Sequence, residues 1–164
     1  MTGVSEAMQT LYAGDRDRAE SLLPPDDQVN VFEAAAFGRV ERLAALLAGD
    51  PELVNSYSPD GFTPLHLACY SGGAAVARVL AEHGADLESL SRASFAKVRP
   101  LGTAAFSGDR ESAAVLLEAG ADPNGPAEGE FTPLHAARQN GDNEFVRLLL
   151  EHGADPELVP DSND

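Results

Sequence analysis

Apolar residues recur along the chain at the spacing of short helices. Leu65, Ala68 and Cys69 lie three and four positions apart, so they share one face of a helix. Val76 and Leu80 stand four positions apart and begin the same pattern again after a short polar interval. The pattern predicts two successive helices, each of which buries a narrow apolar face.

Start and stop signals frame these two helices. Thr63 is placed to cap the first helix, and Pro64 follows at the first helical position, where its missing N–H costs nothing. Gly72 is expected to end the first helix and Gly84 the second, because glycine takes the left-handed conformation cheaply. The chain from 85 to 95 must then extend outward and return, which predicts a β-turn finger.

Two sequence motifs of this unit recur farther along the chain. Residues 61–68 read Gly-Phe-Thr-Pro-Leu-His-Leu-Ala, and residues 130–137 read Glu-Phe-Thr-Pro-Leu-His-Ala-Ala. Residues 80–86 and 149–155 share the pattern Leu-x-Glu-His-Gly-Ala-Asp. Both pairs are offset by 69 positions, which predicts two copies of one structural unit with another copy between them.

The intermediate copy is degenerate. Arg-Pro-Leu-Gly at 99–102 stands in place of Thr-Pro-Leu-His. Leu-Leu-Glu-Ala-Gly-Ala-Asp at 116–122 matches the second motif, and it begins 36 positions after residue 80 and 33 positions before residue 149. A weaker copy runs from 29 to 54. These motifs and their period resemble the ankyrin repeat, a family with a period near 33 and a Thr-Pro-Leu-His signature. The resemblance implies an all-α fold, a helix-turn-helix solenoid with β-turn fingers and about four repeats, at about 28–59, 60–95, 96–128 and 129–157.

The two ends of the chain depart from the repeat. Residues 1–27 hold two helical segments, 7–13 and 16–23, without a full finger between them and the next repeat. A solenoid needs a polar outer face at each end, so we interpret 1–27 as an N-terminal helical cap. The tail at 158–164 is acidic, and we expect it to be disordered.

The charge of the chain narrows the choice of partners. Its 164 residues include 27 acidic and 11 basic side chains, for a net charge of −16. This charge repels phosphate backbones and anionic lipids, so we expect neither nucleic acid nor a membrane as a partner. It either serves solubility alone or attracts a basic partner. With one cysteine, Cys69, and no apolar run of signal-peptide or membrane-spanning length, we expect a cytoplasmic protein.

The candidates for chemistry all have structural interpretations. His66 and His135 share one repeat position, and His83 and His152 share another, so equivalent imidazoles stand roughly 20 Å apart, too far to hold one metal ion. The ankyrin resemblance implies that the first two bond to finger backbone, and the second two suit helix C-termini. Cys69 is interpreted as a small core residue. No nucleophile elbow, P-loop or dinucleotide fingerprint is present, so we expect no enzyme, no cofactor and no metal.

The resemblance also implies where a partner protein binds, namely at the finger tips and the exposed face of each first helix. Carried over by position, this gives ten candidate contact residues: Phe62, Leu67, Tyr70, Arg92, Phe95, Lys97, Arg99, Thr103, Phe106 and Gln139. Tyr70 and Phe106, together with Phe37, would form an aromatic stripe of interface anchors. The alternative is packing between repeats, which we expect for Phe37, Phe62 and Phe131.

The third repeat has the most unusual composition. It holds Arg92, Lys97 and Arg99, and no acid occurs between Glu88 and Asp109. This basic window is either drift in a tolerant loop or a contact for an acidic or phosphorylated segment, onto which arginine forks. The expected function is that of a monomeric, non-catalytic module that binds an unidentified protein. The alternatives are a regulator of a specific enzyme and a binder of an anionic ligand at the third finger.

Overall fold

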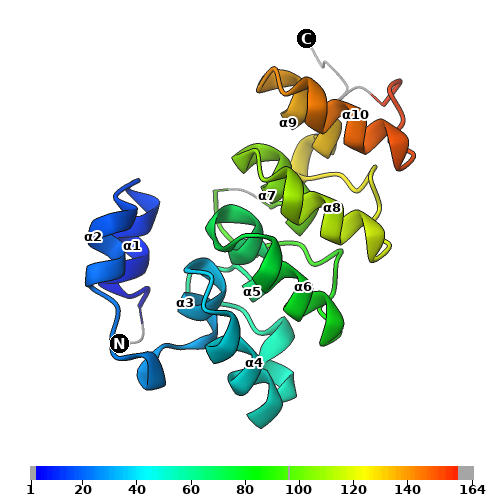
Figure 1. The fold of residues 1–164 in the computed structure, drawn as a ribbon. Helices are drawn as coiled ribbons and strands as arrows, with labels where there is room; N and C mark the ends of the chain where they lie inside the picture. The colour runs from blue at the N-terminus through cyan, green and yellow to red at the C-terminus, as the bar shows by residue number, and fades with distance from the viewer. Residues whose placement is uncertain (1–2, 96, 159–164) are drawn as a thin grey trace.

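The computed structural model describes residues 3–95 and 97–158. Its regular elements there are short helices, most of them in consecutive pairs that stack along one axis (Figure 1). Four pairs fall within the ranges that the repeated sequence motifs indicate. They are α3 (Val31–Ala36) with α4 (Val40–Gly49), α5 (Pro64–Leu67) with α6 (Ala74–Glu82), α7 (Pro100–Ser107) with α8 (Arg110–Glu118), and α9 (Pro133–Gln139) with α10 (Asn143–Glu151).

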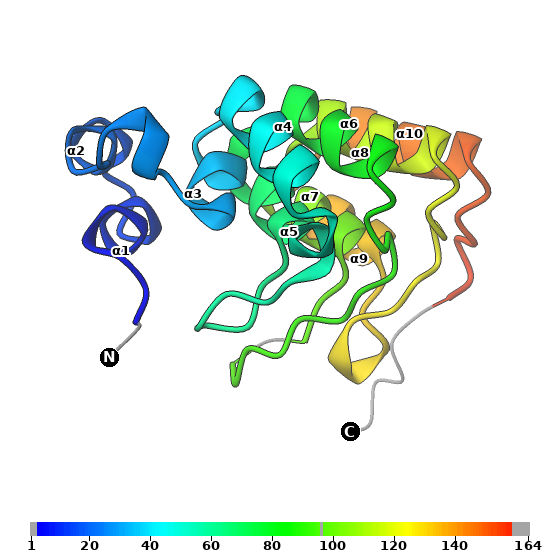
Figure 2. The same ribbon diagram turned by 90° about the horizontal axis from the view of Figure 1, so that it is seen from below.

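The pairs form two layers with fingers on one side. The first helices α3, α5, α7 and α9 lie in one layer, the second helices lie in the other, and the loops between pairs project together from the stack (Figure 2). Ala35, Ala68, Ala104 and Ala137 are fully buried in the first-helix layer. Small side chains let neighbouring pairs approach closely, and each pair buries its apolar face against its neighbours. The short turns η2 (Pro51–Asn55) and η4 (Glu128–Glu130) lie in the connections.

Polar side-chain caps begin α3, α5 and α9, as predicted for Thr63 in α5. The Thr63 hydroxyl accepts from the N–H of His66, and Nδ1 of His66 accepts from the N–H of Thr63. Thr132 and His135 repeat this arrangement at the start of α9. Reciprocal bonds of this kind satisfy N–H groups that lack a partner inside the helix, which explains why the Thr-Pro-Leu-His motif starts a helix.

Equivalent backbone hydrogen bonds close successive fingers. In the finger before α5, the N–H of Ser58 donates to the carbonyl oxygen of Phe62 at 2.8 Å. In the finger before α7, the N–H of Ser91 donates to the carbonyl oxygen of Val98 at 2.9 Å. The second bond spans seven positions where the first spans four. The extra length of the third repeat therefore lies in its finger.

The turn between α5 and α6 differs from the prediction. Gly72 does not have a positive φ; Gly73 does, with a φ of 94° and an extended ψ of 175°. Gly72 ends a wide π-type turn, η3 (Ala68–Gly72), in which the N–H of Gly73 donates to the carbonyl oxygen of Ala68 at 2.9 Å. The chain runs ten positions from Pro64 to the start of α6, as it does from Pro100 to the start of α8, so the wide turn moves the positive φ by one position without an inserted residue.

Gly72 is nevertheless required, for a different physical reason. A Cβ built at this position would lie 1.8 Å from the carbonyl oxygen of Ala35 in α3, and 2.8 Å from a methyl of Val76. Only a residue without a side chain allows the backbones of the first and second repeats to approach this closely.

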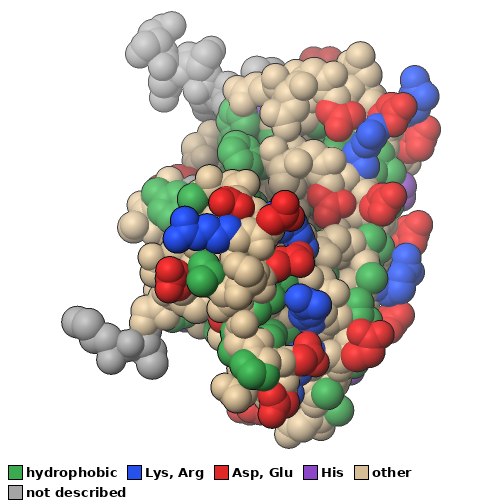
Figure 3. Space-filling view, turned by 60° about the vertical axis from the view of Figure 1, so that its left-hand side comes forward, with side chains coloured by type: hydrophobic (Ala, Val, Ile, Leu, Met, Phe, Trp, Pro, Cys, Tyr) green, Lys and Arg blue, Asp and Glu red, His purple; other side chains and the backbone are tan. Residues whose placement is uncertain are grey.

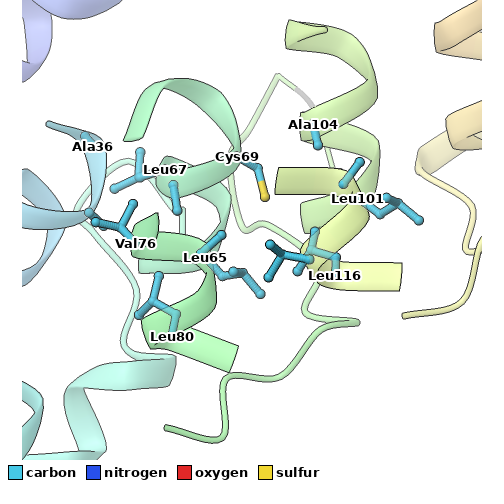
Figure 4. Close-up of a cluster of buried hydrophobic side chains, with 14 of the residues drawn as sticks. Ala36, Leu65, Leu67, Cys69, Val76, Leu80, Leu101, Ala104 and Leu116 are labelled. Carbon is cyan, nitrogen blue, oxygen red and sulfur yellow. The ribbon is translucent and has the colours of Figure 1, made fainter. Parts of the chain in front are cut away.

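Two of the predicted contact residues are buried rather than exposed. Leu67 is 2% exposed and lies in the layer of core side chains with Ala36 and Val76 (Figure 4). Thr103 is also buried, and its hydroxyl donates to the carbonyl oxygen of Arg99 at 3.3 Å. The expectation of exposure was wrong because each first helix buries two faces, one against its second helix and one against the neighbouring repeat.

The N-terminal segment is helical, as predicted, but it does not extend the stack. Helices α1 (Glu6–Tyr12) and α2 (Arg16–Ser21) lie beside the first-helix layer, and the turn η1 (Asp26–Gln28) leads from them into α3 (Figures 1 and 2). The pair therefore covers a side of the solenoid, where an end cap was expected. Of the tail expected to be disordered, residues 159–164 lie outside the described part of the chain.

Candidate functional site

A groove with a volume of about 610 Å³ runs along the first-helix layer. Helix α1 forms one wall, residues of the first helices form the floor, and the fingers form the other wall. A concave site of this size with a mainly apolar lining is typical of ligand sites. Its six aromatic side chains are Tyr12, Phe62, Tyr70, Phe95, Phe106 and Phe131.

Two of these rings are largely exposed to solvent. Phe95 is 77% exposed at the tip of its finger, and Phe106 is 74% exposed near the end of α7. The Phe95 ring lies 6.0 Å, between centroids, from the half-buried ring of Phe62. Removing such rings from water is favourable, so a partner that covers them gains free energy.

The predicted aromatic stripe is only partly realised. Phe37 is buried, as expected, and so it offers no surface. The half-buried ring of Tyr70 packs edge to face on Tyr12, with 5.7 Å between the ring centroids. Phe106 remains as the exposed anchor, and Phe62 and Phe131 contribute half-buried rings to the groove wall rather than lying in the core.

The N-terminal pair is held in place by specific contacts with the stack. The Arg16 guanidinium donates to the carbonyl oxygen of Ser71 at 2.9 Å and lies over the ring of Phe37, 5.8 Å from its centroid. Together with the contact between Tyr12 and Tyr70, these interactions fix α1 as a wall of the groove. The sequence pattern gave no sign of this role, because residues 1–27 do not follow the repeat that aligned the other contact positions.

Tyr12 and Asp60 form a polar end in this apolar groove. The Tyr12 hydroxyl is buried beside the Asp60 carboxylate, which acts on it through its charge and through a hydrogen bond, but the two groups are not aligned well enough to complete that bond. Burial first, and then the nearby charge of Asp60, raise the pKa of the Tyr12 phenol above its ordinary value. The Asp60 carboxylate accepts from the Ser58 hydroxyl. Among the residues that the structure describes, no Lys, Arg or His forms an ion pair with Asp60.

The basic window of the third repeat is largely used within the chain. Arg99 pairs with the Glu88 carboxylate at 3.3 Å and donates to the carbonyl oxygen of Pro126 at 3.1 Å. The Arg92 guanidinium stacks 3.7 Å from the centroid of the Tyr57 ring. The interpretation as a basic patch overlooked Glu88, which borders the acid-free window in the sequence but contacts Arg99 across the finger.

The groove brings together half of the predicted contact residues. Lys97 and Gln139 are exposed outside the groove lining, Arg92 and Arg99 are engaged as described, and Leu67 lies in the core. The five that line the groove are Phe62, Tyr70, Phe95, Thr103 and Phe106.

The buried histidine and cysteine lie outside the groove lining. Because Nδ1 of His66 accepts from Thr63, Nε2 carries the proton and donates to the carbonyl oxygen of Val98 at 2.8 Å. Burial lowers the pKa of His66 to about 4, so the imidazole is neutral at neutral pH. Cys69 is fully buried, and burial raises the pKa of its thiol, which suppresses the reactive thiolate.

The histidines at the helix ends have the predicted environment. Nδ1 of His83 lies 2.7 Å from the carbonyl oxygen of Val79, and Nδ1 of His152 lies 2.9 Å from that of Leu148. Within 3–95 and 97–158, no group of three or more His, Cys, Asp or Glu side chains is arranged to hold a metal ion. No helix in the same ranges has the length and apolar character needed to cross a membrane.

Comparison with known proteins accounts for most of the chain. A family model described as ankyrin repeats in three copies matches residues 7–91, 31–127 and 91–159. Over 67 residues the chain is 39% identical to the Probable E3 ubiquitin-protein ligase XBOS31 of Oryza sativa subsp. japonica. That similarity covers 40% of this chain and 15% of the relative, so it does not extend the relative's named activity to this chain.

Proposed function

Because the chain belongs to the ankyrin repeat family, whose repeats are generally protein–protein interaction modules, we propose that it binds a partner protein in the groove. The family assignment agrees with the all-helical, helix-turn-helix architecture predicted from the repeated sequence motifs. The proposed role is non-catalytic, as is typical of this fold.

The convergence of aromatic rings in the groove is the observation that carries this proposal. Phe95 comes from a finger and Phe106 from a first helix, yet both rings border one groove while largely exposed. Contiguous exposed apolar surface of this kind marks interaction sites, and aromatic side chains are frequent anchors of binding energy.

The placement of the reactive groups supports binding rather than catalysis. Covalent catalysis requires a nucleophile beside an activating base and open to substrate. The Cys69 thiol and the His66 imidazole are both buried, and neither belongs to the groove lining. The groove therefore presents mainly apolar contact surface.

Replacing both exposed rings should abolish partner binding without unfolding the chain. The variant Phe95→Ser/Phe106→Ser removes apolar surface that is already in water, so the free energy of unfolding should change by less than about 0.5 kcal/mol. Capture from an extract of the source cells, quantified by mass spectrometry, should show a stoichiometric partner with the wild type and at least about a tenfold loss with this variant.

The matched control replaces two exposed leucines that do not line the groove. Leu150 and Leu158 are 40% and 41% exposed, so Leu150→Ser/Leu158→Ser removes apolar surface elsewhere. This control should retain the partner at the wild-type level. Equal retention by the ring variant and the wild type would refute the groove as the binding site.

A further inference from the structure

We propose that the groove takes a partner segment in which a large apolar side chain stands beside a lysine or arginine. This inference rests on the proposed function and adds the chemistry of the partner to it. The apolar side chain would lie among the rings of Phe62, Phe95 and Phe106, and the cation would reach the polar end at Tyr12 and Asp60.

The buried Tyr12 hydroxyl, whose hydrogen bond to the Asp60 carboxylate is incomplete, is the first observation behind the cationic part. A buried hydroxyl that lacks a hydrogen bond costs free energy, and a ligand that supplies one recovers it. An N–H donor placed between the two groups would donate to the Asp60 carboxylate, to the Tyr12 oxygen, or to both.

The state of Asp60 is the second observation. Its carboxylate is half-buried in the groove wall, and the groups shown beside it are the neutral Ser58 and Tyr12 hydroxyls. These neutral neighbours leave the carboxylate without a cationic partner, and a charge-assisted hydrogen bond from a ligand is stronger than a neutral one. An acidic partner segment would instead meet like charge.

The charge of the whole molecule favours the same partner. The chain carries a net charge of −16, and acidic side chains are spread across the face that Figure 3 shows, with fewer basic ones among them. Of the bases on the finger before α7, Arg99 is paired with Glu88, Arg92 is stacked on Tyr57, and Lys97 is exposed outside the groove lining. This field accelerates the approach of a basic segment.

A random peptide library tests the inference while the partner is still unidentified. Phage that display random 12-residue peptides would be selected on the full chain and counter-selected on Phe95→Ser/Phe106→Ser. We expect enriched peptides to pair an aromatic or large aliphatic residue with a neighbouring Lys or Arg. Enrichment of acidic peptides, or no enrichment over the input library, would overturn the inference.

Two variants then test the polar end with the selected peptides. Asp60→Asn keeps the shape of the side chain and should weaken peptide binding by about 10- to 100-fold, as expected for loss of a charged hydrogen bond. Tyr12→Phe removes the buried hydroxyl and should weaken peptide binding. The control Glu118→Gln removes one negative charge from an exposed position on α8 and should leave affinity within about twofold.

The outcomes separate this inference from the proposed function. If peptides lose binding in the ring variant but not in Asp60→Asn or Tyr12→Phe, the groove binds a partner but the cationic part is wrong. If acidic peptides are enriched and compete with the captured partner protein, the proposed function stands and the inferred chemistry fails. If the ring variant also retains the captured protein, the proposed function itself fails.

Discussion

Gly72→Ala is expected to destabilise the protein by about 3 kcal/mol or more, although it adds a single methyl group. The added Cβ would lie 1.8 Å from the carbonyl oxygen of Ala35, and backbone cannot move aside as the end of a flexible side chain can. The first and second repeats would have to separate, and the alanines between them would lose contacts. The free energy of unfolding in urea, followed by circular dichroism, measures this effect.

Two further glycine substitutions serve as controls for this prediction. Gly73→Ala places alanine at a φ of 94° and a ψ of 175°, a conformation essentially restricted to glycine, with nothing within 4 Å of its Cβ, so it should cost about 1–3 kcal/mol from backbone strain alone. Gly102→Ala lies inside α7 with open space around its Cβ and should stabilise the helix by about 0.5–1 kcal/mol. A loss at Gly72 no larger than that at Gly73 would show that the close approach of the backbones is unimportant.

Stability is also expected to fall by roughly 3 kcal/mol as the pH drops from about 6.5 to about 4, because His66 is buried as a neutral imidazole. The folded-state pKa of His66 is lowered to about 4, whereas an unfolded chain protonates this side chain near 6.5. Between these values the unfolded state binds more protons, so acid favours unfolding; above pH 6.5 the full stability is present. His135 also has a pKa lowered by burial and adds a smaller effect of the same sign.

Urea unfolding at a series of pH values between 5 and 7 tests this prediction. The wild type should lose about 1.4 kcal/mol per pH unit at the lower end of this range, where the unfolded chain carries one extra proton. His66→Gln should flatten the dependence. If His66→Gln keeps the wild-type slope, another group controls the acid response.

The parts of the fold that the sequence predicted are those with a local physical cause. A reciprocal cap requires a spacing of three positions, which Thr63 and His66 have. The Thr-Pro-Leu-His motif therefore specifies the start of a helix. The length of the third finger likewise follows from three extra residues between two closing positions. Local rules of this kind do not depend on how neighbouring repeats are arranged.

The features that the sequence did not predict depend on contacts between distant segments. The position of Leu67 against the neighbouring repeat, and the pairing of Arg99 with Glu88, follow from stacking and from the path of a finger. The placement of α1 depends on contacts that Tyr12 and Arg16 make with the second repeat, and neither residue belongs to a repeated motif. Half of the candidate contacts and the polar end of the groove were therefore assembled only by the fold.

Site-specific photocrosslinking tests the central claim, that the groove holds the partner, most directly. Benzoylphenylalanine would replace Phe106 in one protein and the exposed Leu150, which lies outside the groove lining, in another. Illumination in an extract of the source cells should join the captured partner to position 106 and not to position 150. An adduct of that partner at position 150, with none at 106, would place the interface elsewhere and contradict the account.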